Sequence, residues 1–370
     1  MKIALLGAGH IGQTIARLLA ASGDYQVTVI DRDAAALARI AGAGLTTRVV
    51  DTEDPPTLLA TLCDAPGGGR HDAVVNALPY HLATATATLA REAGCHYFDL
   101  TEDVAATREI KRLAQGAMTA FMPQCGLAPG FIGIVAHHLA QGFETLHDVK
   151  MRVGALPAFP TNALKYNLTW SVDGLINEYC HPCEAIRDGQ PIEVLPLEGL
   201  EHFSLDGTEY EAFNTSGGLG TLCETLAGRV RTLDYKSVRY PGHRALMTML
   251  LEDLRLKEDT ATLKNILRQS VPGTMQDVVL VFVTVSGLKR GALVQEVFAR
   301  KIFADRSEAT PLSAIQITTA AGLCAALDLF REGRLPQRGF IRQEQVELPA
   351  FLANRFGSAY QQSRQVESIG

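Results

Sequence analysis

Leu6-Gly7-Ala8-Gly9-His10-Ile11-Gly12 is the stretch that decides the fold. It directly follows the short apolar run 3–6, and the helical run 13–21 comes next. A second apolar run, 27–30, then ends at Asp31. A strand, a glycine turn, a helix and a second strand ending in an acid form the pattern of a dinucleotide-binding site. We therefore predict a functional dinucleotide site here, rather than a purely structural turn.

Each residue type in this pattern has a physical role. Gly7 permits the tight turn, Gly9 lets the backbone approach a pyrophosphate, and Gly12 lets helix and strand pack closely. The N-terminus of the helix offers free N–H groups and a partial positive charge. We expect the cofactor-binding residues to be Gly7, Gly9, His10, Ile11, Gly12, Asp31, Arg32, Asp51, Asn76, Ala77 and Leu78.

The acid at the end of the second strand indicates which dinucleotide is bound. Asp31 is close to the expected distance for holding the ribose hydroxyls of the adenosine, and its charge repels a 2′-phosphate. NAD is therefore favoured over NADP. Arg32 is adjacent and softens that preference.

Length and composition bound the class of protein. The chain has 370 residues, 47% of them hydrophobic, which is enough for two domains and a sizeable core. With a net charge of −6 and no run of Lys and Arg, a nucleic-acid partner is not expected. No signal-type leader and no stretch of about 18 apolar residues occurs, so we expect a cytoplasmic protein without a membrane partner.

The cysteines indicate a reducing compartment. There are seven, an odd number without regular spacing, which favours reduced thiols. Cys180-His181-Pro182-Cys183 has the look of a redox or metal pair, but it does not follow a βαβ strand and no second ligand pair has zinc-finger spacing. A loop with two free thiols is the favoured interpretation, and no metal site is predicted.

Apolar strands and helices alternate over the first 120 residues or so. This alternation predicts a parallel sheet with helices on both faces, in a dinucleotide-binding domain spanning 1–127. Ligands of such sheets bind beyond the C-terminal ends of the strands. Several polar or reactive residues fall at these ends and should line one crevice: Asn76, Tyr80, Asp99, Thr101 and Cys125.

The pattern of apolar and polar residues changes after Gly126-Leu127-Ala128-Pro129-Gly130. Long alternating segments predict a mostly antiparallel sheet with a few helices, in a substrate-binding and dimerisation domain spanning 128–308. The apolar run 311–332 predicts a long helix that opens C-terminal helices, 309–370, which return to the first domain. The expected fold class is α/β, a Rossmann-type domain with an inserted α+β domain.

Two segments of the second half are candidate anion sites. Thr215, Ser216 and Gly217 precede the helical run 221–227, and such a helix start offers free N–H groups and two hydroxyls to a carboxylate or phosphate. The alternative is an ordinary N-cap and turn.

Lys236 and Arg239 form the second candidate. Alternation along a strand puts them on opposite faces, so in a half-buried sheet one of the two cations should point inward at an anion. The alternative is a solvated strand edge. For Cys125 the alternatives are an acid/base thiol and a small buried filler, of which we favour the filler.

Five motifs together carry a family resemblance over nearly the whole chain. They are Leu6–Gly12, Val75-Asn76-Ala77-Leu78-Pro79-Tyr80, Gly126–Gly130, Glu211-Ala212-Phe213-Asn214-Thr215-Ser216-Gly217-Gly218 and Leu233-Asp234-Tyr235-Lys236-Ser237-Val238-Arg239-Tyr240-Pro241-Gly242-His243. The chain resembles the saccharopine dehydrogenase family, and within it most closely the L-lysine 6-dehydrogenases. Leu219-Gly220-Thr221-Leu222, in place of a Pro-rich continuation, favours that branch.

The resemblance implies a homodimer and hydride transfer to NAD from a carbon that bears an amine. The expected reaction is oxidative deamination of the side-chain amine of L-lysine to the semialdehyde and ammonia. Candidate catalytic residues are Tyr80, Asp99, Cys125 and His243, and candidate substrate-binding residues are Thr215, Ser216, Gly217, Lys236 and Arg239.

Two other functions remain open at this point. One is a dehydrogenase of the saccharopine or carboxynorspermidine type, which cleaves or forms a secondary amine. It needs a second anion-binding group, which Arg152, Lys165 or Arg244 would supply. The other is a non-catalytic NAD-binding protein on the same fold.

Overall fold

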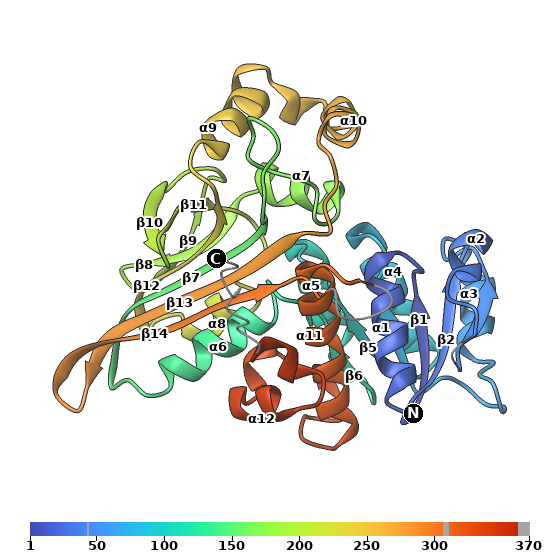
Figure 1. The fold of residues 1–370 in the computed structure, drawn as a ribbon. Helices are drawn as coiled ribbons and strands as arrows, with labels where there is room; N and C mark the ends of the chain where they lie inside the picture. Colours follow the sequence, from blue (N-terminus) through green and yellow to red (C-terminus); the bar gives the residue numbers. More distant parts are fainter. Residues whose placement is uncertain (43, 306–310, 362–370) are drawn as a thin grey trace, which may run out of the picture. The chain divides into compact units, whose positions relative to one another are not determined.

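The computed structural model describes residues 1–42, 44–305 and 311–361. The chain divides into two compact units. The first unit comprises Met1–Phe131 and Thr319–Ala359, and the second comprises Ile132–Thr318 with the residues from Tyr360 onward (Figure 1). The chain passes from the second unit back into the first within one helix, α11 (Ala314–Arg331).

The first unit is built on a seven-stranded parallel sheet in the order β15-β6-β5-β4-β1-β2-β3. Its strands are β1 (Lys2–Leu6), β2 (Gln26–Asp31), β3 (Thr46–Val49), β4 (Ala73–Asn76), β5 (His96–Asp99), β6 (Ala120–Met122) and β15 (Gly339–Phe340). The chain runs outward from β1 through β2 and β3, then restarts on the other side with β4. The C-terminal ends of β1, β2 and β4 therefore meet at the point where the strand order reverses, which is where open α/β sheets bind ligands.

Helices cover both faces of this sheet (Figure 1). They are α1 (His10–Ala21), α2 (Ala34–Ala38), α3 (Pro55–Leu62), the 3₁₀ turn η1 (Tyr80–Leu82), α4 (Ala83–Glu92) and α5 (Val104–Leu113). Helices α3, α4 and α5 pack on the face that carries Ala4 and Leu6. The 18-residue α11 lies against the opposite face, where the ring of Phe330 is 5.3 Å from that of Phe98. Burial on both faces explains why the central strands, such as β1 and β4, are apolar runs.

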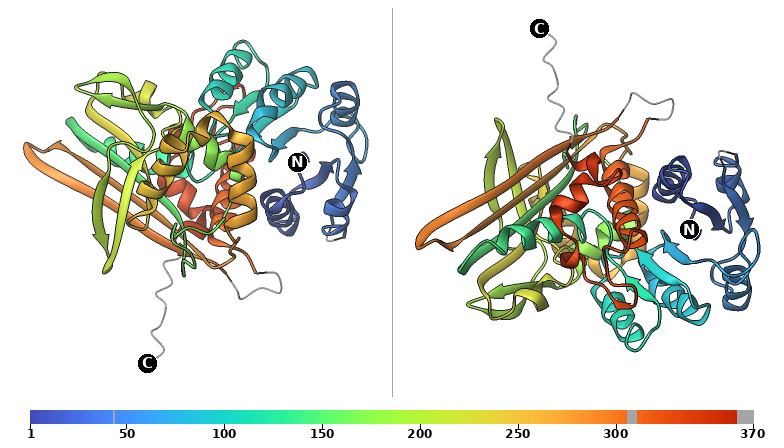
Figure 2. Two further views of the ribbon diagram at one scale, coloured as in Figure 1. Left: turned by 90° about the horizontal axis from the view of Figure 1, so that it is seen from above. Right: turned by 90° about the horizontal axis from the view of Figure 1, so that it is seen from below.

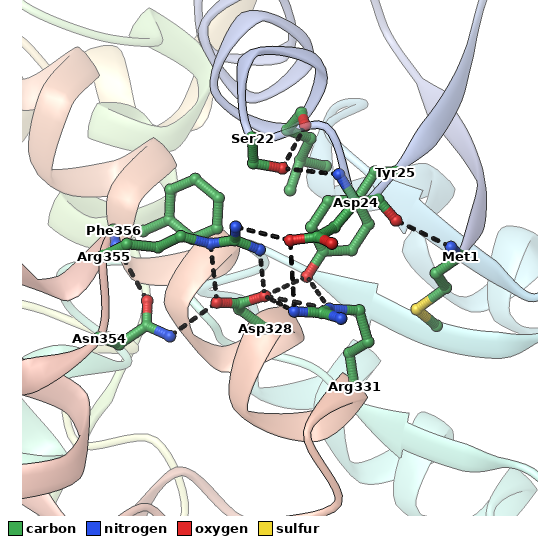
Figure 3. A network of polar contacts seen from close by, with 10 residues as sticks. Met1, Ser22, Asp24, Tyr25, Asp328, Arg331, Asn354, Arg355 and Phe356 are labelled. Atoms are coloured by element: carbon green, nitrogen blue, oxygen red, sulfur yellow. Dashed lines mark hydrogen bonds and ion pairs between the residues drawn. The ribbon is translucent and has the colours of Figure 1, made fainter.

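A buried carboxylate connects α11 with the start of β2 (Figure 3). Asp328 is 1% exposed and accepts hydrogen bonds from the Tyr25 hydroxyl at 2.6 Å and the Asn354 amide at 2.8 Å. Arg331 and Arg355 form ion pairs with the same carboxylate at 3.1 and 2.8 Å. One side chain thereby joins segments from both ends of the chain.

The second unit contains a mixed eight-stranded sheet. Its main path is β10-β11-β12-β7-β13-β14, and a hairpin of β8 and β9 pairs with β12. The long orange hairpin in both views of Figure 2 is formed by β13 and β14. The strands are β7 (Thr145–Pro157), β8 (Cys183–Arg187), β9 (Gln190–Val194), β10 (Glu201–Leu205), β11 (Thr208–Asn214), β12 (Val230–Arg239), β13 (Asp277–Lys289) and β14 (Ala292–Phe303). Among these described strands, β12 and β7 form the one parallel pair. The predicted fold class is confirmed.

One end of this sheet is covered by helices. Side chains of α7, α9, η2 and α10 form a core with Tyr166 and Phe213. The remaining helical elements of the described chain are α6 (Phe131–Ala140), α7 (Val172–Cys180), α8 (Leu222–Leu226), α9 (His243–Thr248), η2 (Met249–Asp253), η3 (Leu256–Glu258), α10 (Thr260–Ser270), η4 (Gln343–Gln345), α12 (Leu348–Ala353) and η5 (Gly357–Tyr360). None of the helices within the described ranges is both long and apolar enough to cross a bilayer.

Several element boundaries differ from the prediction. The alternation of strands and helices predicts a helix over 80–94, but this segment begins as the 3₁₀ turn η1 and becomes α-helical only at Ala83. The helix expected from 311 begins at Ala314, because the buried carboxylate of Asp277 accepts hydrogen bonds from the N–H groups of Ala314 and Ile315 at 2.6 and 3.0 Å. Cys180 ends α7 and Cys183 begins β8, and both thiols are free.

Candidate functional site

The glycine loop of the first unit has the geometry that its sequence requires. Gly7 has a φ of +101°, and a Cβ there would lie 2.9 Å from the Ala77 carbonyl oxygen. A Cβ on Gly12 would lie 2.0 Å from the Gly7 carbonyl oxygen. Both positions therefore exclude a side chain, one by backbone conformation and contact and the other by contact alone.

Gly9 differs from its two neighbours. A Cβ there would meet no atom within 4 Å, and both Gly9 and His10 are exposed. Gly9 is the N-cap of the 12-residue helix α1, and no side chain caps this end. Open space next to uncapped helical N–H groups fits the pyrophosphate of a dinucleotide. Ile11, half-buried, completes the first turn.

Asp31 holds the glycine loop from the end of β2. Its Oδ2 accepts a hydrogen bond from the Ala8 N–H at 2.6 Å, and its Oδ1 accepts one from the Asp33 N–H at 2.8 Å. Each oxygen retains a second lone pair, so the partly exposed carboxylate keeps acceptor capacity for ribose hydroxyls.

The residues beside Asp31 form a small charged surface. Arg32 makes an exposed ion pair with Glu53 at 3.1 Å. Asp51 is also exposed, and its Oδ1 accepts a hydrogen bond from the Glu53 N–H at 3.0 Å. Arg32, which follows Asp31 in the sequence, is thus already paired with an acid of the chain.

Asn76, Ala77 and Leu78 form the turn after β4. The Asn76 amide donates to the Tyr97 hydroxyl at 3.1 Å, and its oxygen accepts from the Leu78 N–H at 3.0 Å. Ala77 donates its N–H to the Leu6 carbonyl oxygen at 2.9 Å. The 3% exposed Asn76 side chain therefore shapes the turn, and the backbone at Ala77 lies against the glycine loop.

Asp99 is the last residue of β5, and its side chain contacts the segment that follows β6. Its carboxylate accepts from the Tyr97 hydroxyl at 2.9 Å and from the N–H groups of Thr101 and Gln124 at 3.0 and 2.8 Å. Burial raises the pKa of Asp99 to about 6, against these three hydrogen bonds, which lower it. With 1% of its surface exposed, Asp99 fixes two strand ends and does not line an open crevice.

Cys125 is next to Asp99 in space. Its N–H donates to the Asp99 carbonyl oxygen at 2.8 Å, and its thiol donates to the Met122 carbonyl oxygen at 3.1 Å. The thiol is 1% exposed, and burial raises its pKa well above the ordinary range. This geometry is that of a buried filler. Tyr80, in contrast, is half-buried in η1.

In the second unit, Lys236 and Arg239 extend from opposite faces of β12, as the alternation predicts. Lys236 forms an ion pair with Glu201 at 2.9 Å and donates to the Gly199 carbonyl oxygen. Arg152, 2% exposed, is paired with Glu201 and with Asp234. On this face the anions belong to the protein, so neither Lys236 nor Arg152 is available for a substrate carboxylate.

Arg239 has a different environment. It is 3% exposed, its Nη1–H donates to the Val238 carbonyl oxygen at 2.8 Å, and its Nε has no hydrogen-bond partner among the described residues. Its guanidinium carbon lies 5.2 Å from the ring centre of Tyr166 and 5.8 Å from that of Tyr179. Within the described ranges Arg239 forms no ion pair, although Glu178 is near enough to influence its pKa.

His243 is completely buried beside this arginine. Its Nδ1 lies 2.9 Å from the Leu164 carbonyl oxygen, so Nδ1 carries the proton, and Nε2 accepts from the Tyr179 hydroxyl at 3.1 Å. Burial, followed by the charge of Arg239, lowers the pKa of His243 to about 3. His243 is therefore neutral at physiological pH and holds Tyr179 in place.

The helix that the sequence predicts over 221–227 is α8, which spans Leu222–Leu226. Thr215, Ser216 and Gly217 lie in the turn before it and are not part of its first turn. The Thr215 hydroxyl is 2.8 Å from that of Ser237, and the Ser216 hydroxyl donates to the Pro182 carbonyl oxygen at 2.9 Å. Gly217, with a φ of +86°, turns the chain after them. Both hydroxyls thus have partners inside the protein.

Sequence reasoning missed Tyr166 and Tyr179. The structure places both rings on Arg239, and both are almost fully buried. Tyr166 lies in a loop, and Tyr179 lies on a helix that was not predicted. The periodicity of the sequence carried no signal for either position.

Two models of one protein family match this sequence. Residues 3–122 match the family model described as the saccharopine dehydrogenase NADP binding domain, and residues 126–354 match the saccharopine dehydrogenase C-terminal domain. No nicotinamide specificity for this chain follows from the first description.

Among solved structures, the chain is similar to apo saccharopine dehydrogenase (L-Glu forming) from Saccharomyces cerevisiae. The TM-score is 0.77 at 18% identity, over 95% of this chain and 96% of that one. A myo-inositol dehydrogenase from Corynebacterium glutamicum also matches, with a TM-score of 0.45 at 16% identity over 98% and 96% of the two chains. The two matched domains span most of the sequence and include both the glycine loop and β12, and the chain belongs to the saccharopine dehydrogenase family of NAD(P)-binding oxidoreductases.

Proposed function

We propose that this protein catalyses the NAD-dependent oxidative deamination of an amino acid, with the side-chain amine of L-lysine as the substrate group. The observation that carries the proposal is Arg239, a buried cation that forms no ion pair within the described residues, although the charge of Glu178 influences its pKa. A guanidinium binds a carboxylate through two parallel hydrogen bonds, so the α-carboxylate of an amino acid is a matching ligand.

NAD is the proposed cofactor. The carboxylate of Asp31 at the end of β2 disfavours a 2′-phosphate, and Glu53 holds the neighbouring cation, Arg32. When bound, the nicotinamide accepts the hydride that leaves the amine-bearing carbon. The resulting substrate imine is hydrolysed to the semialdehyde and ammonia.

The protein must orient the substrate and must exchange a proton with it. Arg239 orients the substrate by its carboxylate. Among the four candidate catalytic residues, Asp99, Cys125 and His243 are each at most 1% exposed. Tyr80 is half-buried at the end of the β4 turn, and we favour it as the residue that exchanges a proton with the substrate.

We expect activity to rise into alkaline pH. Hydride can leave only when the substrate amine is neutral, and the amine of free lysine has a pKa of about 10.4. The rate at low substrate concentration should therefore increase steadily from pH 7 to about pH 10. Tyr80→Phe should lower this rate at each pH and leave the rise in place, because the substrate amine causes the rise. NADH formation at 340 nm measures both, and a maximum below pH 7 would contradict the neutral-amine argument.

A second candidate function is supported by Lys165 and Arg244. Each donates to a backbone carbonyl, Lys165 to Pro241 at 2.9 Å and Arg244 to Leu197 at 2.7 Å, so each retains donors for a second carboxylate. A dehydrogenase of the saccharopine or carboxynorspermidine type needs such a group, because its secondary amine carries a second acid arm.

One assay separates these functions. Purified protein is offered NAD⁺ or NADP⁺ with L-lysine, saccharopine, carboxynorspermidine and a panel of other amino acids and amines, and reduction is followed at 340 nm. Turnover of lysine supports the first proposal, and turnover of saccharopine or carboxynorspermidine alone supports the second. Cofactor binding without any turnover would identify a non-catalytic NAD-binding protein. We also propose a homodimer, which light scattering of the purified protein tests.

A further inference from the structure

Strand β14 forms an open edge of the second unit's sheet (Figure 2). Among the described strands it pairs only with β13, and it does so over all 12 of its residues. An edge strand leaves about half of its N–H and C=O groups without a strand partner. At the opposite end of the main path, β10 has only five residues. The sheet therefore offers β14 as a long template to which a further strand can pair.

Apolar side chains of this edge strand face water. Leu293 is 71% exposed and Val297 is 51% exposed, and both point to the same face because they are four residues apart. Phe303, on the same face near the other end, packs instead with Val278 and Leu280 in a core cluster. One end of the strand is thus apolar and open, and the other end is apolar and covered. Long apolar edges of this kind are normally protected in proteins.

The residue types of β14 are arranged symmetrically. From 293 to 303 the sequence is Leu-Val-Gln-Glu-Val-Phe-Ala-Arg-Lys-Ile-Phe, with Phe298 at its centre. On each side of Phe298 there follow an apolar residue, a charged residue, a further polar residue and two apolar residues. The charged residue is Glu296 on one side and Arg300 on the other. Two copies of this strand in antiparallel orientation therefore match each other in type at every position.

The geometry of strand pairing allows this match. In an antiparallel pair, facing residues either both direct their N–H and C=O groups toward the other strand or both direct them away. For two identical strands, the two-fold axis therefore passes through a residue position. With the axis at Phe298, Glu296 of each copy faces Arg300 of the other, and Leu293 of each copy faces Phe303 of the other. The open apolar end of one copy is then covered by the other.

Shifting the axis by one residue removes these matches. With the axis at residue 297, the apolar Leu293 faces the cation of Lys301. With the axis at residue 299, the carboxylate of Glu296 faces the apolar Ile302. Facing pairs of opposite charge and facing apolar pairs stabilise a sheet, so the sequence favours the axis at Phe298 over both neighbouring registers.

The charged pair of this arrangement is available. The guanidinium of Arg300 donates one Nη1–H to the Ala299 carbonyl oxygen at 2.8 Å, and its carbon lies 4.8 Å from the ring centre of Phe298. Arg300 forms no ion pair within the described residues. Glu296 is paired with Lys289 through one carboxylate oxygen, Oε1, so its other oxygen retains acceptor capacity.

We propose that two copies of this chain associate through β14, pairing antiparallel about a two-fold axis at Phe298. The two sheets then form one continuous sheet, and each copy contributes the same surface, as a two-fold interface requires. The inference rests on the homodimer proposed above and assigns it an interface. It does not depend on the identity of the substrate.

Charge reversal tests the facing pair. Glu296→Arg brings two arginines together at both symmetric positions, and Arg300→Glu brings two glutamates together. Each single variant should raise the dissociation constant of the dimer at least about tenfold, because like charges then face each other. The double variant restores opposite charges and should return the constant to within about threefold of that of the unaltered protein. Sedimentation velocity over a dilution series measures all three.

Glu193→Arg is the matched control. It makes the same change of charge at an exposed position on β9 of the same sheet, and it should leave the dissociation constant unchanged. Circular dichroism and the melting temperature report whether each variant folds. Arg300→Glu keeps the Lys289–Glu296 pair, so it carries the test alone if Glu296→Arg does not fold. A dimer that neither single reversal weakens would overturn the proposal.

Cysteine substitutions report the register. Cys63→Ser first removes the exposed native thiol. Val297→Cys combined with Ala299→Cys then places a thiol of each copy opposite a thiol of the other, so mild oxidation should give a covalent dimer that a reductant reverses. Neither single cysteine should form this dimer. Crosslinking by a single cysteine would place the axis at that residue, and absence of crosslinking by the pair would exclude the interface.

The outcomes separate this inference from the earlier proposals. A protein that is monomeric at every concentration measured overturns both the homodimer and its interface. A dimer that is insensitive to the reversals leaves the homodimer standing and overturns the role of β14. Oxidation of lysine, or its absence, bears on the proposed reaction and on neither of these.

Discussion

The two cations of β12 have different partners, although they lie on the same strand. Lys236 and Arg239 are three residues apart, but one is paired with Glu201 and the other with no carboxylate of the described chain. The alternation of the strand predicted that they face opposite ways. It could not predict which one would meet a protein carboxylate, because Glu201 lies on another strand, β10, and reaches Lys236 only through the fold.

Arg239→Ala should raise the KM for the amino acid substrate at least about thirtyfold and leave the affinity for NAD⁺ unchanged. Truncating one partner of a buried charge pair costs about 2 to 5 kcal/mol, which corresponds to that factor or more. Initial rates at varied substrate and a separate NAD⁺ titration measure the two quantities.

Lys236→Met is the control for this prediction. It removes the other cation of the same strand, while Glu201 keeps its pairing with Arg152. Stability should fall with little change in KM. An unchanged KM for Arg239→Ala would remove this residue from the substrate site.

Glu53→Gln should improve the use of NADP⁺. The substitution releases Arg32 from an exposed ion pair, and such pairs contribute at most about 1 kcal/mol, so the gain in kcat/KM for NADP⁺ should be no more than about fivefold. Steady-state rates with both cofactors test this. A fall in NADP⁺ use would show that Arg32 does not face the ribose, and the NAD⁺ parameters serve as the internal control.

At the scale of elements, continuous apolar runs predicted the central parallel strands β1, β2 and β4 correctly, because these strands are buried on both faces. The two-residue edge strand β15 was not predicted. Helix α7 was missed, although Ser171 caps its first turn by accepting from the Gly174 N–H at 3.3 Å. Its sequence contains Gly174 and polar residues, and the helix is stabilised by packing against α10 and Phe213, which no local pattern reveals.

The anion site expected at Thr215–Gly217 also depends on partners that are distant in the sequence. Tyr235 lies so close to Gly218 that a Cβ on the glycine would be 2.2 Å from the ring. This contact keeps the segment as a turn, and Ser237 and Pro182 take up the two hydroxyls on which the anion-site prediction depended. The cofactor loop was predictable because a tight turn before a helix itself requires glycine. The candidate substrate-binding residues could not be predicted in this way, because their contacts are with residues far apart in the sequence.

Two substitutions in the glycine loop can distinguish effects on packing from effects on NAD⁺ binding. Gly12→Ala places a methyl group 2.0 Å from the Gly7 carbonyl oxygen, so it should lower the melting temperature by several degrees. Gly9→Ala meets nothing within 4 Å, so it should leave stability almost unchanged and weaken NAD⁺ binding about tenfold or more. Calorimetry and NAD⁺ titration distinguish the two effects, and equal loss of stability in both variants would contradict this assignment.

At the scale of the whole molecule, Asp328 makes the first unit sensitive to acid. Burial raises its pKa, but hydrogen bonds from Arg355, Tyr25 and Asn354 outweigh burial and hold the pKa below the ordinary value. A depressed folded-state pKa contributes stability that is present above the unfolded pKa of about 3.9 and is lost as pH falls through the folded value.

Asp328→Asn should therefore destabilise the protein at pH 7 by about 3 kcal/mol, the low end for a broken buried pair, since both arginines remain partly exposed. The difference from the unaltered protein should shrink below pH 4. Denaturant unfolding across this range measures it. A difference that does not change with pH would show that the carboxylate charge is not what stabilises this network.

The discontinuity of the first unit has a consequence for biosynthesis. Its sheet is completed by β15, and its face is covered by α11, and both elements follow every strand of the second unit's sheet in the chain. A ribosome adds roughly 5 to 20 residues per second, so the N-terminal strands wait many seconds for the segments that cover them. During that time their apolar surface is open to chaperones and to aggregation, and the second unit is the first that can close around a complete set of its own strands.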